Sequence, residues 1–105
     1  GTPSFMSPEQ LAGRVVTGSA DLFSLAVTAF QLLTGQLPFR GDSMPALMLR
    51  IAHEPNPRIR NIRPDLPAGL DEVFERALAK DPAGRYDSGA AMAQALRDVN
   101  SPDSR

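Results

Sequence analysis

The chain has 105 residues, a formal net charge of −1 at pH 7 and 42% hydrophobic residues, as expected for one ordinary globular domain or a part of one. A charge so near zero argues against nucleic-acid binding through a general positive field. The lack of cysteine excludes a disulfide framework and thiolate metal ligands, and a single histidine gives no basis for a zinc site.

The first predicted helix begins at Pro8, directly after the segment 1–6. Ser7 is suited to cap it, and Gln10, three residues later, completes a capping box. Pro8 occupies the first helical position, where a missing N–H leaves no hydrogen bond unmade. Glu9 lies in the first turn, where the helix dipole favours a negative charge. These four residues predict a well-defined helix start.

The stretch 19–35 carries the strongest helical pattern of the chain. Ser19 is expected to cap this helix, Asp21 lies in its first turn, and Gly35 supplies a left-handed stop. Between positions 22 and 33 only three side chains are polar, and their spacing makes one narrow stripe: Ser24, Thr28 and Gln31. A helix that is apolar nearly all round is typical of the middle of a larger lobe, and this one is too short to span a bilayer.

Three further helices are predicted after Gly35. The first starts at Asp42 or Ser43 and continues to 54, the second covers 70–78, and the third follows Ser88 and continues to 99. In the second, Glu72 and Arg76 are spaced as an exposed i,i+4 pair. The Pro- and Arg-rich segment 55–67 is expected to be an extended surface loop, and 100–105 a frayed tail. Because strand-like alternation is nearly absent, the predicted fold is all-α.

Four stretches occur in order along this sequence: GTPSFMSPEQ, ADLFSLA, LLTGQLPF and LAKDPAGRY. Together they resemble the C-terminal half of the large lobe of a serine/threonine protein kinase, and are most similar to the eukaryotic-like kinases of bacteria. The resemblance covers residues 1–99. It implies a helical subdomain of the kinase C-terminal lobe, built around one central buried hydrophobic helix.

The resemblance also implies a substrate-binding loop at the start of the chain. In the family this loop receives the substrate residue that follows the phosphoacceptor. Here it corresponds to six residues: Gly1, Thr2, Pro3, Ser4, Phe5 and Met6. The hydroxyl of Thr2 would bond to the catalytic loop, and Phe5 and Met6 would wall the pocket. From the residues alone, the same segment also fits a plain turn into a capped helix.

Two further roles follow from the resemblance. Ser7-Pro8-Glu9 resembles the Ala-Pro-Glu signature, and KDPAGRY supplies the arginine that pairs with that glutamate, so we expect a largely buried, bidentate ion pair between Glu9 and Arg85. The alternative is an exposed pair that contributes less than about 1 kcal/mol. Asp21 resembles the aspartate that accepts hydrogen bonds from the catalytic-loop backbone. Its alternative is a first-turn acid stabilised only by the helix dipole.

The motifs that a kinase needs for phosphoryl transfer are not found in the 105 residues: a Gly-rich loop, a strand lysine, a catalytic Asp and Asn, and Asp-Phe-Gly. We therefore expect no catalytic residue, metal site or cofactor in this segment, and no activity from it alone. The chain is expected to begin inside the activation segment of a longer parent. That parent would bind ATP and Mg²⁺ and transfer the γ-phosphate to Ser or Thr of protein substrates.

Two other function classes compete with this one. The first is a non-catalytic interaction module, either a pseudokinase lobe or a helical protein-docking domain. Intact or degraded catalytic motifs directly upstream would separate it from an enzyme. The second, an all-helical DNA-binding domain, is disfavoured by the net charge and the lack of a basic recognition helix.

Partners and location follow from composition. No signal peptide and no run of about 18 apolar residues is present, so we expect a cytoplasmic segment without membrane contact, while the parent can carry an anchor elsewhere. The expected partners are protein substrates of the parent and no nucleic acid. The central helix offers more apolar side chains than four short helices can cover, so self-association of the isolated segment is expected. These side chains are Leu22, Phe23, Leu25, Val27, Phe30, Leu32 and Leu33.

Overall fold

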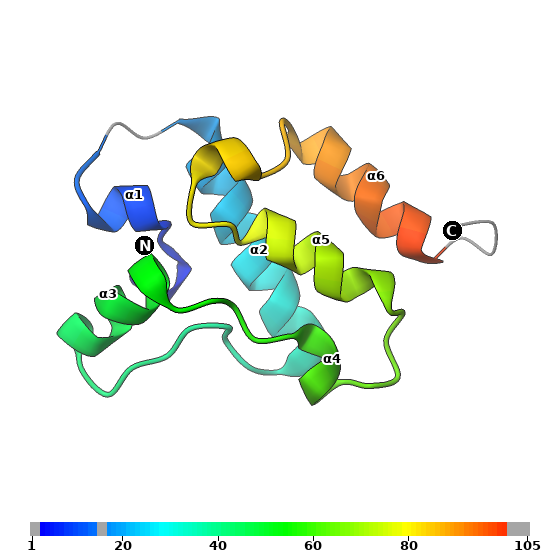
Figure 1. Cartoon of the computed structure of the whole chain (residues 1–105), viewed down its shortest axis with the longest axis horizontal. Coiled ribbons are helices and arrows are strands. Elements are labelled where there is room, and N and C mark those ends of the chain that lie inside the picture. Colours follow the sequence, from blue (N-terminus) through cyan, green and yellow to red (C-terminus); the bar gives the residue numbers. More distant parts are fainter. Residues whose placement is uncertain (1–2, 15–16, 101–105) are drawn as a thin grey trace.

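The computed structural model describes residues 3–14 and 17–100, and within these ranges it contains helices and turns but no strand (Figure 1). The all-α prediction is confirmed for this part of the chain. In chain order the elements are η1 (Pro3–Phe5), α1 (Pro8–Leu11), α2 (Gly18–Thr34), α3 (Met44–His53), α4 (Ile59–Ile62), α5 (Gly69–Ala77), η2 (Pro82–Gly84) and α6 (Gly89–Asn100). None of these helices is long and apolar enough to cross a membrane.

Helix α1 starts as its sequence predicts. The Gln10 backbone N–H donates to Ser7 Oγ at 3.4 Å, and the Ser7 backbone N–H donates to Gln10 Oε1 at 2.8 Å. These reciprocal bonds form the capping box and satisfy two backbone donors that the first turn would otherwise leave unpaired. Ser7 is completely buried, so this helix start is part of the packed interior.

Helix α2 begins earlier than expected. Thr17 is its N-cap, and Thr17 Oγ1 accepts a hydrogen bond from the Ser19 backbone N–H at 3.3 Å, so Ser19 is already inside the helix. The prediction that Ser19 caps the helix was therefore wrong, because a second hydroxyl residue two positions upstream takes that role. The predicted end is confirmed: Gly35 has a φ of 75°, in the left-handed region that glycine adopts without strain.

One face of α2 forms the centre of the core. Phe23, Val27 and Phe30 on this face are completely buried. The Phe30 ring meets Phe74 of α5 edge-to-face at a centroid distance of 5.6 Å, and Phe23 stacks on Phe39 at 6.3 Å. In Figure 1, α2 passes behind α5 through the middle of the molecule. The predicted central helix is present.

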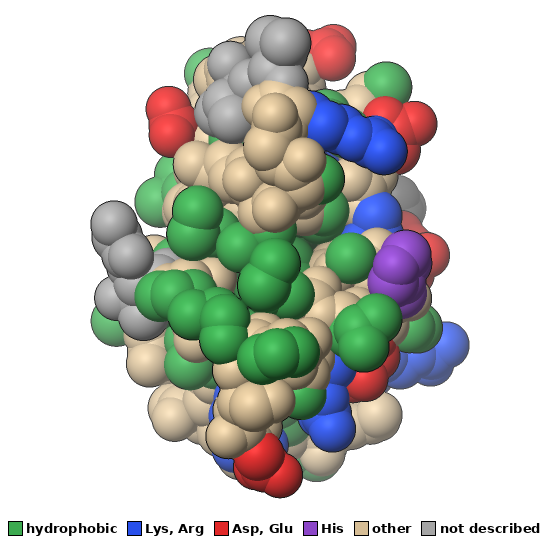
Figure 2. Space-filling model, turned by 90° about the vertical axis from the view of Figure 1, so that its left-hand side faces the viewer, with side chains coloured by type: hydrophobic (Ala, Val, Ile, Leu, Met, Phe, Trp, Pro, Cys, Tyr) green, Lys and Arg blue, Asp and Glu red, His purple; other side chains and the backbone are tan. Residues whose placement is uncertain are grey.

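The opposite face of α2 is not covered by the described residues. Leu25 is 51% exposed and Leu32 is 81% exposed. Phe23, Val27 and Phe30, which we expected to be difficult to cover, are buried, so the uncovered apolar surface is narrower than the sequence suggests. Figure 2 shows that hydrophobic side chains also gather on the face that carries α1 and α3. Within α3, Leu49 is 62% exposed.

The segment 55–67 is not entirely extended, because it contains the short helix α4. Ile59 at its start is completely buried. The Arg60 backbone N–H donates to Asp71 Oδ1 at 3.1 Å, and Arg60 Nε donates to the Leu66 carbonyl at 2.9 Å. These contacts to α5 and to the following loop stabilise a helical turn that the local sequence does not specify.

Two details of the last helices differ from expectation. No ion pair joins Glu72 to Arg76 in the described structure, and the Arg76 guanidinium lies over the Tyr86 ring, 4.4 Å from its centroid. Helix α6 ends at Asn100, one residue into the expected tail, and 101–105 lie outside the described residues. Ser88 occupies its predicted capping position, since the Ala91 backbone N–H donates to Ser88 Oγ at 3.0 Å.

Candidate functional site

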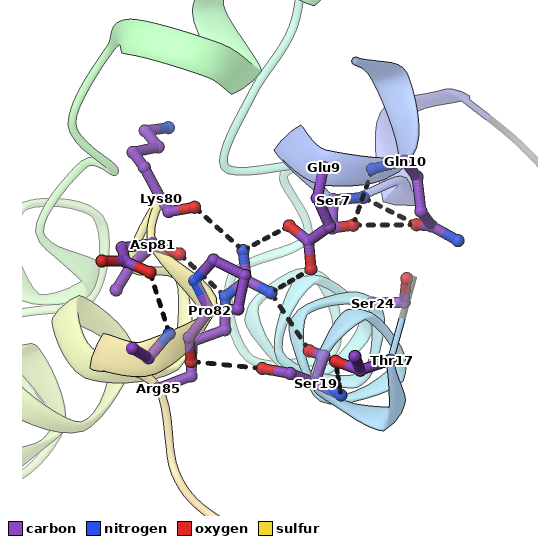
Figure 3. A network of polar contacts seen from close by, with 12 residues as sticks. Ser7, Glu9, Gln10, Thr17, Ser19, Ser24, Lys80, Asp81, Pro82 and Arg85 are labelled. Carbon is purple, nitrogen blue, oxygen red and sulfur yellow. Dashed lines mark hydrogen bonds and ion pairs between the residues drawn. The ribbon is translucent and has the colours of Figure 1, made fainter. Parts of the chain in front are cut away.

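The structure brings Glu9 and Arg85 together across 76 residues of sequence (Figure 3). Arg85 Nη1 donates to Glu9 Oε2 at 2.7 Å, and Arg85 Nη2 donates to Glu9 Oε1 at 2.8 Å. The Arg85 side chain is 0% exposed and the Glu9 side chain 6%. The pair is therefore bidentate and buried, and the exposed alternative does not apply.

Arg85 also donates hydrogen bonds to three backbone carbonyls. Its Nε donates to Ala79 O at 2.8 Å, Nη1 to Ser19 O at 3.2 Å, and Nη2 to Lys80 O at 3.2 Å. Together with the two bonds to Glu9, these occupy all five N–H donors of the guanidinium group. Arg85 thus joins α1, the start of α2 and the turn after α5 at one point.

The electrostatics of Glu9 suit a structural role. Burial alone would raise the pKa of the Glu9 carboxyl. The Arg85 hydrogen bonds, the Glu9 backbone N–H and the Arg85 charge outweigh burial and hold the pKa of Glu9 below its ordinary value. A carboxylate held ionised with both oxygens occupied is not available as a general base.

A second contact reinforces the same junction. The hydroxyl of Ser19 donates to the Pro82 carbonyl at 3.3 Å, which ties the first turn of α2 to η2. In Figure 3, Ser19 and Glu9 lie around Arg85. Within the described residues, no buried side-chain nitrogen or oxygen lacks a hydrogen-bond partner, so this polar junction is fully satisfied.

The segment predicted to bind substrate lies directly before this junction. Gly1 and Thr2 lie outside the described residues. Pro3, Ser4 and Phe5 form the turn η1, and Met6 follows it, with its backbone N–H donating to the Pro3 carbonyl at 3.1 Å. All four are partly buried, and Phe5 packs against the core.

Ser24 of α2 also contacts this segment, which sequence reasoning did not predict. Its hydroxyl donates to the Phe5 carbonyl at 2.5 Å. The only sequence signal was a small polar residue on an otherwise apolar helix, where Thr28 and Gln31 give the same signal. Those two are exposed, whereas Ser24 is partly buried.

Asp21 is exposed in the first turn of α2. No residue of the described chain donates a hydrogen bond to its carboxylate. It lies one helical turn before Leu25, on the side of α2 that the described residues leave open.

Comparison with known proteins assigns this arrangement to a family. The sequence profile described as "Protein kinase domain" matches residues 1–97. The chain belongs to the protein kinase domain family. Over 97 residues it is 46% identical to serine/threonine-protein kinase Pkn1 of Myxococcus xanthus, which covers 92% of this chain and 14% of that protein. Over 92 residues it is 33% identical to serine/threonine-protein kinase PrkC of Bacillus subtilis. That match covers 88% of this chain and 14% of PrkC.

A solved kinase domain has the same fold. The structure superposes on a crystal structure of the Mycobacterium tuberculosis PknI kinase domain with a TM-score of 0.73 and 35% sequence identity, covering 91% of this chain and 34% of that one. The sequence-based resemblance to bacterial serine/threonine kinases is thereby confirmed. The chain spans about one seventh of the length of each of these two curated kinases.

Potential metal ligands are scattered in the described part of this kinase-family chain. No three His, Cys, Asp or Glu side chains converge in residues 3–14 and 17–100. The carboxylate at the centre of the junction, Glu9, is already occupied by Arg85.

A cavity of about 630 Å³ lies beside the ion pair, between α1, the end of α3 and residues 80–82. Lys80 lines it. The Lys80 ammonium donates to the Ile51 carbonyl at 2.7 Å and lies 4.0 Å from the centroid of the Phe39 ring. Burial lowers the pKa of Lys80 to about 8. The negative charge of Glu54 opposes this shift, and the positive charge of Arg85 adds to it. Lys80 thus ties α3 to the turn that carries Arg85.

Proposed function

We propose that this chain is the substrate-side part of a serine/threonine protein kinase, which transfers the γ-phosphate of ATP to Ser or Thr of protein substrates. The observation that carries the proposal is the buried Glu9–Arg85 pair with all five guanidinium donors occupied. Family membership and the kinase names of the similar proteins support it. Because ATP is a cytoplasmic substrate, we also propose a cytoplasmic location.

In this proposal the segment Gly1, Thr2, Pro3, Ser4, Phe5 and Met6 receives the substrate peptide. The capping box of α1 and the Glu9–Arg85 pair anchor the C-terminal end of that segment to the buried core. A loop held in this way presents a peptide backbone in one position, which favours reaction by reducing the orientational freedom of the reactants. The Thr2 hydroxyl would form a hydrogen bond with the catalytic loop of the parent. Asp21 of α2 would accept hydrogen bonds from the backbone of that same loop.

ATP and Mg²⁺ would be bound by parts of the parent kinase outside this chain. When bound, ATP supplies the phosphoryl group and the metal neutralises its charge. The residues of this chain contribute binding and orientation of the protein substrate. The 105-residue chain alone should therefore be inactive.

The test uses the full-length protein that contains this chain. Purified full-length protein is incubated with radiolabelled ATP, Mg²⁺ and a general protein substrate, in parallel with the 105-residue chain. We expect phosphate on Ser or Thr only with the full-length protein. If the full-length protein incorporates none and its upstream catalytic motifs are degraded, the chain is part of a docking module instead.

We also propose that the isolated chain self-associates through the uncovered face of α2. Leu25 and Leu32 support this, because covering each exposed leucine stabilises an assembly by up to about 1.5–3 kcal/mol. Light scattering at micromolar concentration should give a mass above one chain, and Leu32→Gln should lower it. Leu49→Gln on α3 is the matched control. A monomeric mass with cooperative melting would refute the proposal. Dissociation by Leu49→Gln but not by Leu32→Gln would show that the interface lies on α3 and not on α2.

A further inference from the structure

The hydroxyl side chains within α2 form two groups with different partners. Thr28 Oγ1 donates to the Ser24 carbonyl at 3.1 Å and Thr34 Oγ1 to the Phe30 carbonyl at 2.8 Å, so both threonines bond back to their own helix. Such i−4 bonds are the usual partner of a hydroxyl in a helix. Ser19 and Ser24 instead reach other segments of the chain.

The bond of Ser24 stands out within the second group. Ser24 and Phe5 are 19 residues apart, and the 2.5 Å distance to the Phe5 carbonyl is shorter than the 3.3 Å that separates Ser19 Oγ from Pro82 O. Among the described residues it is the only side-chain hydrogen bond that joins α2 to the segment 3–6. The capping box and the ion pair hold the chain only from Ser7 onward.

We infer that Ser24 is a positioning residue for the substrate loop: its hydroxyl fixes the η1 backbone at Phe5 on the rigid central helix. This inference rests on the proposed function, since it assigns Ser24 to the loop that would receive the substrate peptide. Ser24 acts through Phe5 and touches no reacting atom. Its loss should therefore affect binding and orientation of the peptide and leave nucleotide binding unchanged.

The Met6 backbone N–H is a direct reporter of this role. It donates to the Pro3 carbonyl and closes η1, so its hydrogen exchange measures how often that turn opens. In Ser24→Ala, the Phe5 carbonyl loses its side-chain partner. We expect Met6 exchange to become about three- to tenfold faster, the factor that corresponds to one neutral hydrogen bond.

The kinetic arm uses the full-length protein. For Ser24→Ala we expect kcat/KM for a peptide substrate to fall about three- to tenfold, while KM for ATP stays the same. Thr28→Ala is the matched control, because it removes a hydroxyl from the same helix that contacts only that helix. Ser24→Thr keeps the hydroxyl and should restore both the exchange rate and the kinetics.

The results separate this inference from the proposed function. If the wild-type protein shows no kinase activity, the proposed function fails, and Met6 exchange still tests the Ser24 contact. Unchanged Met6 exchange in Ser24→Ala, equal effects in Thr28→Ala, or an equal loss toward ATP and peptide would each overturn the inference. If Ser24→Ala does not fold, Ser24→Thr decides: wild-type exchange supports the hydroxyl role, and fast exchange overturns it.

Discussion

Two arginine–carboxylate pairs in this chain have nearly equal bond lengths and opposite surroundings. Arg85 Nη1 lies 2.7 Å from Glu9 Oε2, and Arg63 Nη2 lies 2.6 Å from Asp65 Oδ2. In the first pair the side chains are 0% and 6% exposed, and in the second they are 44% and 63% exposed. Bond length alone therefore says little about how much each pair stabilises the fold.

The pairs also differ in what they connect. Glu9 and Arg85 join segments 76 residues apart, whereas Arg63 and Asp65 are two residues apart in one loop. The Arg63 guanidinium lowers the pKa of Asp65 to about 2, yet water and salt screen both groups. Removing one partner of the buried pair leaves a charge without solvent, which is the costly situation.

The largest expected effect is that of Arg85→Gln. This variant leaves the Glu9 carboxylate buried without its partner and removes donors from three carbonyls, so unfolding free energy should fall by about 3–5 kcal/mol. Urea denaturation followed by circular dichroism measures the change. A fall in unfolding free energy of less than about 1 kcal/mol is typical of an exposed ion pair. Such a result would show that burial of the Glu9–Arg85 pair does not determine how much it stabilises the fold.

A double-mutant cycle sharpens the same comparison. Because Glu9 and Arg85 bond directly, Glu9→Gln and Arg85→Gln should be non-additive, with a coupling energy of about 0.5–3 kcal/mol. The double variant should be less destabilised than the sum of the single variants. Additive and mild effects in the same denaturation experiment would mean that the pair does not form in solution.

Acid should weaken the buried pair before it affects the rest of the junction. The pKa of Glu9 is lower in the folded chain than its ordinary value of 4.5, so its stabilising contribution is complete above that value and is lost as pH falls below it. The stability difference between wild type and Glu9→Gln should therefore shrink between pH 6 and pH 3. A difference that stays constant across this range would contradict the assignment. Asp65 titrates equally in both proteins and cancels.

The smallest expected effect belongs to the exposed pair. Arg63→Gln removes its contact with Asp65 and one bond to the Leu33 carbonyl, all at the surface. We expect no change in urea midpoint beyond experimental error, at low and at physiological salt. A loss comparable to that of Arg85→Gln would remove the contrast between the two pairs.

The features that sequence predicted were of two kinds. Some were local: the capping box of Ser7 and Gln10 and the left-handed end at Gly35 depend on residues within four positions of each other. The Glu9–Arg85 contact is not local, and no periodicity or spacing in this chain indicates it. It was predicted only because both residues match motifs of the kinase family.

The features that sequence missed depend on tertiary contacts. Helix α4 is too short for a recognisable period, and its backbone is supported by Asp71 from α5. The bond from Ser24 to the Phe5 carbonyl depends on where η1 lies over α2, and Ser24 and Thr28 look alike in sequence although their partners differ. Which of two similar hydroxyls contacts another segment is therefore determined by tertiary packing.

The separation between Glu9 and Arg85 has a consequence for synthesis of the protein. Translation produces Glu9 first, and Arg85 is added 76 residues later. Until Arg85 is available, burial of the ionised Glu9 carboxylate is unfavourable, because the charge would leave water without its partner. The junction of α1, α2 and the turn after α5 is therefore completed only once Arg85 has been translated, and a message truncated before the codon for Arg85 yields a chain that cannot form the pair.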